Sequence, residues 1–163
     1  MNATVKTCFW FDTQAMEAVD FYVSLLPDSR IDAVSHDVAE QGMAPAGTVL
    51  AIDFTLAGTP MQAIIGGPAF TLTEAASISI ATRDQAETDR LWDALLANGG
   101  TPSQCGWLKD RFGLSWQVVP RGMDAFFDES DPARVERAMQ AMLGMRKIDI
   151  AAMRAAADGV TAG

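Results

Sequence analysis

The fold is decided by a stretch that occurs twice, as Glu17-Ala18-Val19-Asp20-Phe21-Tyr22-Val23-Ser24-Leu25-Leu26 and, seventy residues later, as Glu87-Thr88-Asp89-Arg90-Leu91-Trp92-Asp93-Ala94-Leu95-Leu96. Both copies begin with an acid, carry a bulky pair in the middle and end in Leu-Leu. A second echo follows each copy, where Met61-Gln62-Ala63-Ile64-Ile65 is similar to Trp116-Gln117-Val118-Val119-Pro120. An internal duplication constrains the whole fold. It also predicts that a site lies where two related halves face each other.

Each copy is predicted to run strand, helix, then further strands. In the first copy we expect a strand over 5–11, a helix capped by Asp12 or Thr13 and ended at residues 27–29, and strands over 30–38, 48–56 and 60–65. In the second we expect a strand over 76–81, a helix that follows Arg83-Asp84 and runs through Asn98 to a stop at Gly99-Gly100, and strands over 105–109 and 114–119 around a turn at 110–113. Two more helices are expected, one after Asp131-Pro132 and one over 148–157.

Composition narrows the class of protein. The chain has 163 residues, of which 49% are apolar, so it can bury a core as one compact domain. Its net charge of −9 argues against nucleic acid and anionic membrane as partners. Cys8 and Cys105 form no disulfide-type pattern, which is typical of a reducing compartment. With no signal-peptide pattern and no long apolar run, we expect a cytoplasmic protein.

Several segments are similar to one known family. They are Trp10-Phe11-Asp12, Phe21-Tyr22, Pro27-Asp28-Ser29-Arg30-Ile31, Gly66-Gly67-Pro68, the block from Cys105 to Asp110, the block from Phe112 to Pro120, Met139-Gln140-Ala141-Met142-Leu143 and Lys147-Ile148-Asp149-Ile150. Together they resemble the PhnB-like branch, often labelled 3-demethylubiquinone-9 3-methyltransferase-like, of the vicinal oxygen chelate superfamily of glyoxalases, bleomycin-resistance proteins and dioxygenases. The resemblance covers nearly the whole chain. It implies an α+β fold of two βαβββ modules with a curved mixed sheet, residues 1–68 and 69–122, followed by a C-terminal helical tail over 123–163.

The resemblance also locates the positions at which metal-using members hold their ion. Those members take four ligands, usually His and Glu, from the first and last strands of each module. Here the last strands offer Gln62 and Gln117, and the first strands offer only residues 7–9 and 77–79, none of which is a histidine. Neutral amides add no charge to offset the desolvation of a divalent ion. We therefore predict no catalytic metal and no cofactor, and we expect the sole histidine, His36, to be exposed or on an edge strand.

The two glutamines are the candidate ligand-binding residues. A buried amide must find partners for its donors and its acceptor. Gln62 and Gln117 either hydrogen-bond a polar ligand in the cup between the modules, or bond backbone or each other, or point outward; strand alternation leaves these alternatives open. Trp10, Trp107 and Trp116 are predicted to be core or cavity walls. For Asp110 we expect a turn role, and for Cys105 an inert thiol.

Three functions follow from these observations. The first is a metal-free protein that binds a small molecule. The second is an enzyme of glyoxalase, dioxygenase or methyl-transfer type, although Gly66-Gly67-Pro68 does not open a helix as an S-adenosylmethionine turn would. The third is a structural or regulatory dimer built on the methionine-rich tail. By analogy with the superfamily we expect a homodimer, with or without exchange of modules between subunits.

Overall fold

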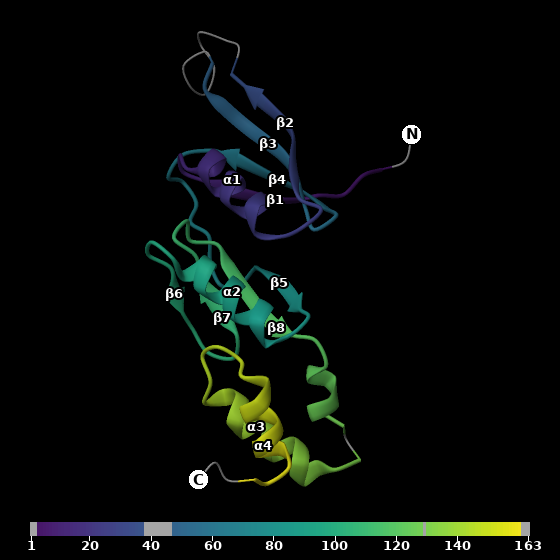
Figure 1. Cartoon of the computed structure of the whole chain (residues 1–163). Helices are drawn as coiled ribbons and strands as arrows, with labels where there is room; N and C mark the ends of the chain where they lie inside the picture. Colours follow the sequence, from purple (N-terminus) through teal and green to yellow (C-terminus); the bar gives the residue numbers. More distant parts are fainter. Residues whose placement is uncertain (1–2, 38–46, 129, 161–163) are drawn as a thin grey trace. The chain divides into compact units, whose positions relative to one another are not determined.

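The computed structural model describes residues 3–37, 47–128 and 130–160 (Figure 1). The chain divides into two compact units, Met1–Leu72 and Thr73–Gly163. No helix among these described residues is long and apolar enough to span a membrane.

The first unit is one βαβββ module. Its elements are β1 (Thr7–Phe11), α1 (Ala15–Leu25), β2 (Arg30–His36), β3 (Val49–Leu56) and β4 (Thr59–Ile65). The strands form a sheet in the order β1-β4-β3-β2, with β1 parallel to β4 and the other pairs antiparallel. The β3–β4 turn is made by Ala57 and Gly58, with φ of 45° and 80°. Two residues of positive φ give the type I′ geometry that matches the twist of a hairpin.

The second unit repeats this arrangement. Its elements are β5 (Ser77–Thr82), α2 (Gln85–Leu96), β6 (Thr101–Pro102), β7 (Trp107–Lys109) and β8 (Ser115–Pro120). The strand order β5-β8-β7-β6, with β5 parallel to β8, has the same connectivity as the first sheet. The α+β fold of two βαβββ modules is therefore confirmed. Strand β6 escaped sequence analysis because two residues, one a proline, are too short for an alternating pattern.

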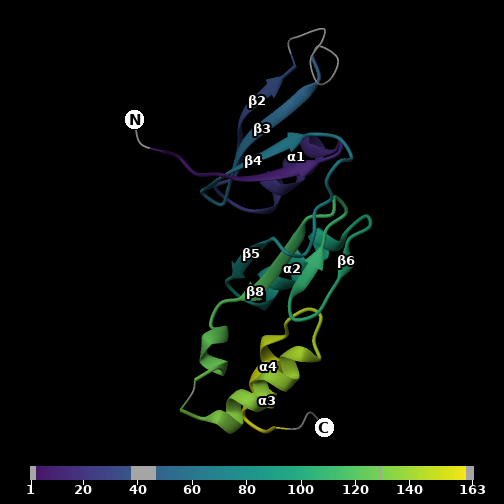
Figure 2. The same ribbon diagram turned by 180° about the vertical axis from the view of Figure 1, so that it is seen from behind.

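Each sheet has one face covered by the helix of its own module. The opposite views in Figures 1 and 2 place α1 on one face of the first sheet and α2 on one face of the second. In the first module α1 buries the side chains of Ala15, Ala18, Val19, Tyr22 and Leu25, at the three-and-four spacing of one helical face. The sheet residues Phe9, Phe11, Ile52 and Phe54 are buried as well. Full burial of such an apolar side chain contributes about 1.5–3 kcal/mol.

The N-terminal caps of α2 and α3 are side-chain hydrogen bonds, whereas that of α1 is not. Asp84 caps α2 by accepting from the amide of Glu87, and Asp131 caps α3 by accepting from the amide of Arg134. The prediction that Asp12 or Thr13 caps α1 was wrong: the N-cap is Gln14, and its side chain makes no capping bond. Because α1 begins only at Ala15, a cap two or three residues earlier lies too far from its unpaired amides.

The tail packs within the second unit. It comprises the 3₁₀ turn η1 (Met123–Phe126) and the helices α3 (Pro132–Leu143) and α4 (Ile150–Ala157). The loop before β7 bonds to it, since the amide of Cys105 donates to Met145 O at 2.8 Å and the amide of Gly106 to Arg146 O at 2.7 Å. On α2, Gln85 donates to Ile148 O and accepts from the amide of Ile150. These bonds fix the tail to the loop before β7 and to the start of α2.

Candidate functional site

The face of each sheet opposite its helix carries the glutamine and is called here its glutamine face. In the first sheet this face includes Cys8, Trp10, Asp53, Gln62 and Ile64, because register places Cys8 beside Gln62, Trp10 beside Ile64 and Asp53 beside Gln62. In the second sheet it includes Ser77, Ser79, Trp107, Lys109, Ser115 and Gln117. Residues paired across strands share a face, so the duplication places Gln62 and Gln117 at matching positions.

Gln62 belongs to a small polar cluster. Its Nε2 donates to Asp53 Oδ1 at 2.9 Å, and Lys6 Nζ lies 2.9 Å from Asp53 Oδ2. The hydrogen bond from Lys6, and then that from Gln62, lowers the pKa of the Asp53 carboxyl. Asp53 therefore stays ionised at neutral pH and orients the Gln62 amide. Sequence analysis missed Lys6 and Asp53 as partners of this glutamine.

Cys8 faces the same cluster from β1. Although the residue is exposed overall, partial burial of its thiol, and then the negative charge of Asp53, raises its pKa. A thiol is nucleophilic only as the thiolate. Cys8 is thus held in its less reactive form.

Gln117 is held by a neutral partner instead. Its Nε2 donates to Ser77 Oγ at 2.8 Å, and Trp107 is its register partner on β7. The amide and the indole are both half-buried. The second glutamine face therefore combines a positioned amide with an aromatic wall.

Trp116 and Trp10 lie in different surroundings. Trp116 is fully buried on the helix face of β8, and its indole Nε1 donates to Asp110 Oδ2 at 2.8 Å. Trp10 is on the first glutamine face, donates through Nε1 to Gly67 O at 2.8 Å and packs edge-on against Phe70 at 5.0 Å. A Cβ on Gly66 would overlap the Trp10 ring, which explains a glycine there. The side chains of Trp116 and Gln117 thus point to opposite faces.

A cavity of about 380 Å³ opens beside the second glutamine face. Trp107, Lys109 and Ser115 line it from β7 and β8, together with Glu74 from the segment before β5. Lys109 Nζ lies 2.6 Å from Glu74 Oε1, and this contact lowers the pKa of Glu74. Ser115 is 1% exposed, and its hydroxyl has no hydrogen-bond partner among the described residues. Sequence analysis missed both as site residues: Glu74 belongs to no motif, and Ser115 was noted only as part of the block from Phe112 to Pro120.

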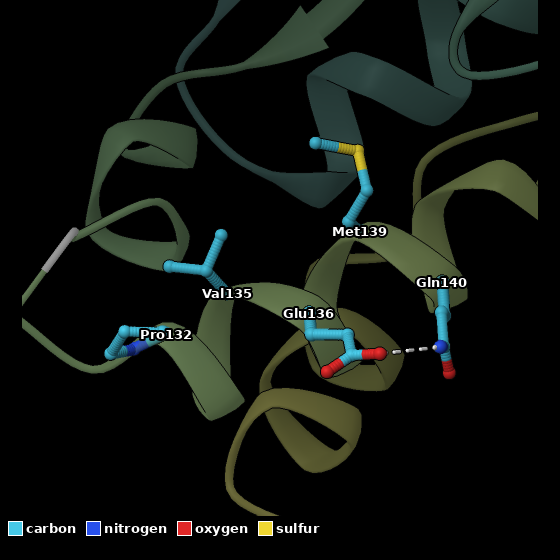
Figure 3. Close-up of a pocket in the computed structure, with 5 residues that line it drawn as sticks. All are labelled: Pro132, Val135, Glu136, Met139 and Gln140. Atoms are coloured by element: carbon cyan, nitrogen blue, oxygen red, sulfur yellow. Dashed lines mark hydrogen bonds between the residues drawn. The ribbon is translucent and has the colours of Figure 1, made fainter.

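A second pocket of about 380 Å³ lies on α3 (Figure 3). Pro132, Val135, Glu136, Met139 and Gln140 line it, and Gln140 donates to Glu136 at 3.4 Å on its polar side. Its surface is mainly apolar, so it offers few groups that could orient a small ligand.

The strand register identifies the residues at the four positions where the superfamily resemblance expects metal ligands. Register pairs Cys8 with Gln62 in the first module and Ser79 with Gln117 in the second. Within the described ranges, no three His, Cys, Asp or Glu side chains are placed to bind one metal ion. His36 is exposed at the end of β2. A thiol and a hydroxyl opposite two amides do not make the charged donor set that a divalent ion requires.

The chain is similar to several known proteins. Residues 3–119 match the family described as 3-demethylubiquinone-9 3-methyltransferase. A solved PhnB protein from Bacillus cereus is 31% identical with a TM-score of 0.65, covering 72% of this chain and 99% of that one. Protein PA1353 from Pseudomonas aeruginosa is 21% identical with a TM-score of 0.58, covering 73% and 98%. A glyoxalase/bleomycin resistance protein from Albidiferax ferrireducens is 16% identical with a TM-score of 0.46, covering 73% and 99%. No curated protein matches the chain.

Proposed function

We propose that this chain, which belongs to the 3-demethylubiquinone-9 3-methyltransferase (PhnB-like) family of the vicinal oxygen chelate superfamily, is a metal-free protein that binds a small organic molecule. The observation that carries the proposal is the cavity of about 380 Å³ beside the second glutamine face. This volume is within the range of small-molecule sites, at its lower end.

The lining of the cavity supports a binding role. Trp107 offers a flat aromatic wall, whereas Lys109 and Ser115 offer donors at its edge. Mainly apolar walls with a few convergent polar groups are typical of ligand pockets. Gln117 does not line the cavity, but its pairing with Trp107 puts its carbonyl oxygen on the same face. We propose Gln117 and Trp107 as ligand contacts, with Gln62 and Trp10 in the matching role in the first module. Trp116 supports the site from the helix face.

The metal-free state is proposed from the donor set. Cys8 is the one side chain among the four that can become a charged ligand, since Ser79, Gln62 and Gln117 carry no charge. Zinc, nickel and iron sites in proteins rely on imidazole, thiolate or carboxylate ligands. The residues at the four positions therefore do not fit such an ion, and we derive no metal-dependent step.

Methyl transfer finds no support in the local backbone. An S-adenosylmethionine site of the common type needs a glycine-rich turn between a strand and a helix. Here Gly66 and Gly67 follow β4, and the described residues from there to β5 form no helix. The family description names a methyltransferase, but the described residues after β4 do not form that turn.

The test is a ligand screen on the full chain. A fragment set containing neutral, acidic and basic compounds is titrated while the Trp107 indole and Gln117 side-chain amide signals are followed by NMR. We expect saturable shifts at both groups with at least one compound, and loss of the Gln117 shift in Trp107→Ala. The matched control is Trp92→Phe, a buried change on α2 that leaves the cavity lining intact. If no compound shifts either signal, the proposal is wrong.

Homodimer formation, with or without exchanged modules, is proposed from the superfamily alone. Sedimentation velocity at micromolar concentration should give the mass of two chains. A monomer under those conditions contradicts this part of the proposal.

A further inference from the structure

The Ser115 hydroxyl is the most unusual polar group beside the cavity. It is 1% exposed, lines the cavity and has no hydrogen-bond partner among the described residues. A buried hydroxyl without a partner is unfavourable, and a ligand acceptor that reaches it recovers the lost interaction. Ser115 therefore marks a point at which a ligand is expected to present an oxygen.

Lys109 supplies a positive charge at the same place. Among the described residues that line the cavity it is the one cation, and it is the register partner of Ser115 across β7 and β8. Side chains directly opposite on antiparallel strands start about 4.5–5.5 Å apart, and the lysine stem is flexible. One carboxylate can thus accept from the Ser115 hydroxyl with one oxygen and from the Lys109 ammonium with the other.

Trp107 defines the shape of the rest of the ligand. It lies two residues before Lys109 on β7, so both side chains point to the same face. An indole packs best against another flat, apolar group. The cavity volume limits this group to one or two rings.

Glu74 already contacts the proposed anion position. Its Oε1 lies 2.6 Å from Lys109 Nζ, yet its side chain is 69% exposed and it belongs to a segment without regular structure. Exposed ion pairs of this kind are weak, so a ligand carboxylate can replace Glu74. The net charge of −9 does not prevent this, because charges more than about 8 Å away are largely screened at physiological ionic strength.

We propose that the cavity binds a small planar carboxylic acid, with its carboxylate on Lys109 and Ser115 and its ring against Trp107, and that Glu74 is an internal competitor for Lys109. This inference rests on the proposed binding function and adds the chemical class of the ligand.

The test uses cinnamate and its neutral analogue cinnamamide as probes on the full chain, with affinities from calorimetry and contacts from NMR. We expect cinnamate to bind at least about 10-fold more tightly than cinnamamide, since hydrogen bonds to charged groups are the stronger ones. Ser115→Ala should weaken cinnamate binding about 10-fold. It should not destabilise the protein, because the removed hydroxyl makes no hydrogen bond to the described residues. Lys109→Met should weaken cinnamate to the level of cinnamamide.

Glu74→Gln distinguishes a competitor from a structural partner. We expect it to tighten cinnamate binding about 2- to 5-fold, from the range for exposed ion pairs, and to leave cinnamamide unchanged. The control is Lys147→Met, which removes a comparable ion pair with Asp89 away from the cavity. It should change neither affinity.

Failure of this inference can be told apart from failure of the binding function. If cinnamamide binds at Trp107 as tightly as cinnamate, or if Ser115→Ala or Glu74→Gln has no effect on cinnamate, the carboxylate inference is wrong while the binding function stands. If neither probe shifts Trp107, the inference is wrong, and the fragment screen decides the binding function separately.

Discussion

Replacing Trp116 with Phe should destabilise the second unit through one hydrogen bond. Asp110 is 3% exposed and accepts from the amides of Phe112 and Leu114 at 2.8 and 3.1 Å, and from the indole of Trp116 at 2.8 Å. The substitution removes the indole donor and leaves a small cavity. A hydrogen bond to a charged group contributes about 1.5–3 kcal/mol, and the missing ring atoms add to this. We expect a total loss of about 2–4 kcal/mol.

A double-mutant cycle isolates the bond itself. Asp110→Ala should lower the free energy of unfolding by about 3–5 kcal/mol, because it removes the carboxylate that accepts from three buried donors. The double variant loses the indole bond only once. Its loss in the free energy of unfolding should therefore be about 1.5–3 kcal/mol smaller than the sum of the two single losses. The control is Trp107→Phe, a change of the same size at a half-buried indole.

Urea unfolding followed through β8 amide signals provides the measurement, since two compact units need not unfold together. If Trp116→Phe lowers the free energy of unfolding no more than Trp107→Phe, the Trp116–Asp110 hydrogen bond does not stabilise the turn. Additive effects of Trp116→Phe and Asp110→Ala would lead to the same conclusion. The result bears on the site because this turn joins Lys109 to Ser115.

Three further outcomes are expected. Gly106→Ala should lower the stability of the second unit by about 1–3 kcal/mol in urea unfolding, because φ is +81° and the new Cβ would lie 2.8 Å from Val118 O; an unchanged midpoint contradicts this. In a Cys105→Ser background at pH 8, Cys8 should react with a disulfide reagent more slowly than free cysteine, because its pKa is raised and less thiolate is present. Asp53→Asn removes the charge that contributes to this rise, so it should speed the reaction, and an equal rate refutes that cause. Protein purified without chelators should contain only substoichiometric zinc, nickel and iron, and chelator treatment should leave cinnamate affinity unchanged; stoichiometric metal overturns the metal-free proposal.

The duplication predicted the fold because its signals are patterns among neighbouring residues. Helical spacing and strand alternation are properties of neighbouring residues, so α1, α2 and the strands around Gln62 and Gln117 could be found from the sequence. The partner of Gln62 was also within reach. A two-residue turn that pairs Leu56 with Thr59 necessarily pairs Asp53 with Gln62.

The cavity could not be predicted in this way. Glu74 lies in a segment without regular structure, so no period fixes its position relative to Lys109. The Ser115–Lys109 pairing depends on the conformation of the intervening turn, where the buried Asp110 carboxylate accepts from the amides of Phe112 and Leu114. These contacts arise from tertiary packing, and the residue types alone gave no signal for them.

The two modules have kept the same backbone while the charges around their glutamines have become different. In the first, the Asp53 carboxylate on β3, 32% exposed, already holds both the Gln62 amide and the Lys6 ammonium, so a ligand acid would have to displace it. In the second, Gln117 is held by the neutral Ser77, and the nearest cavity offers the Lys109 ammonium instead. A ligand acid is therefore favoured on only one of two similar faces. This difference supports the proposal that a carboxylate binds to the second module, whereas the duplication alone would have treated both glutamines as equivalent.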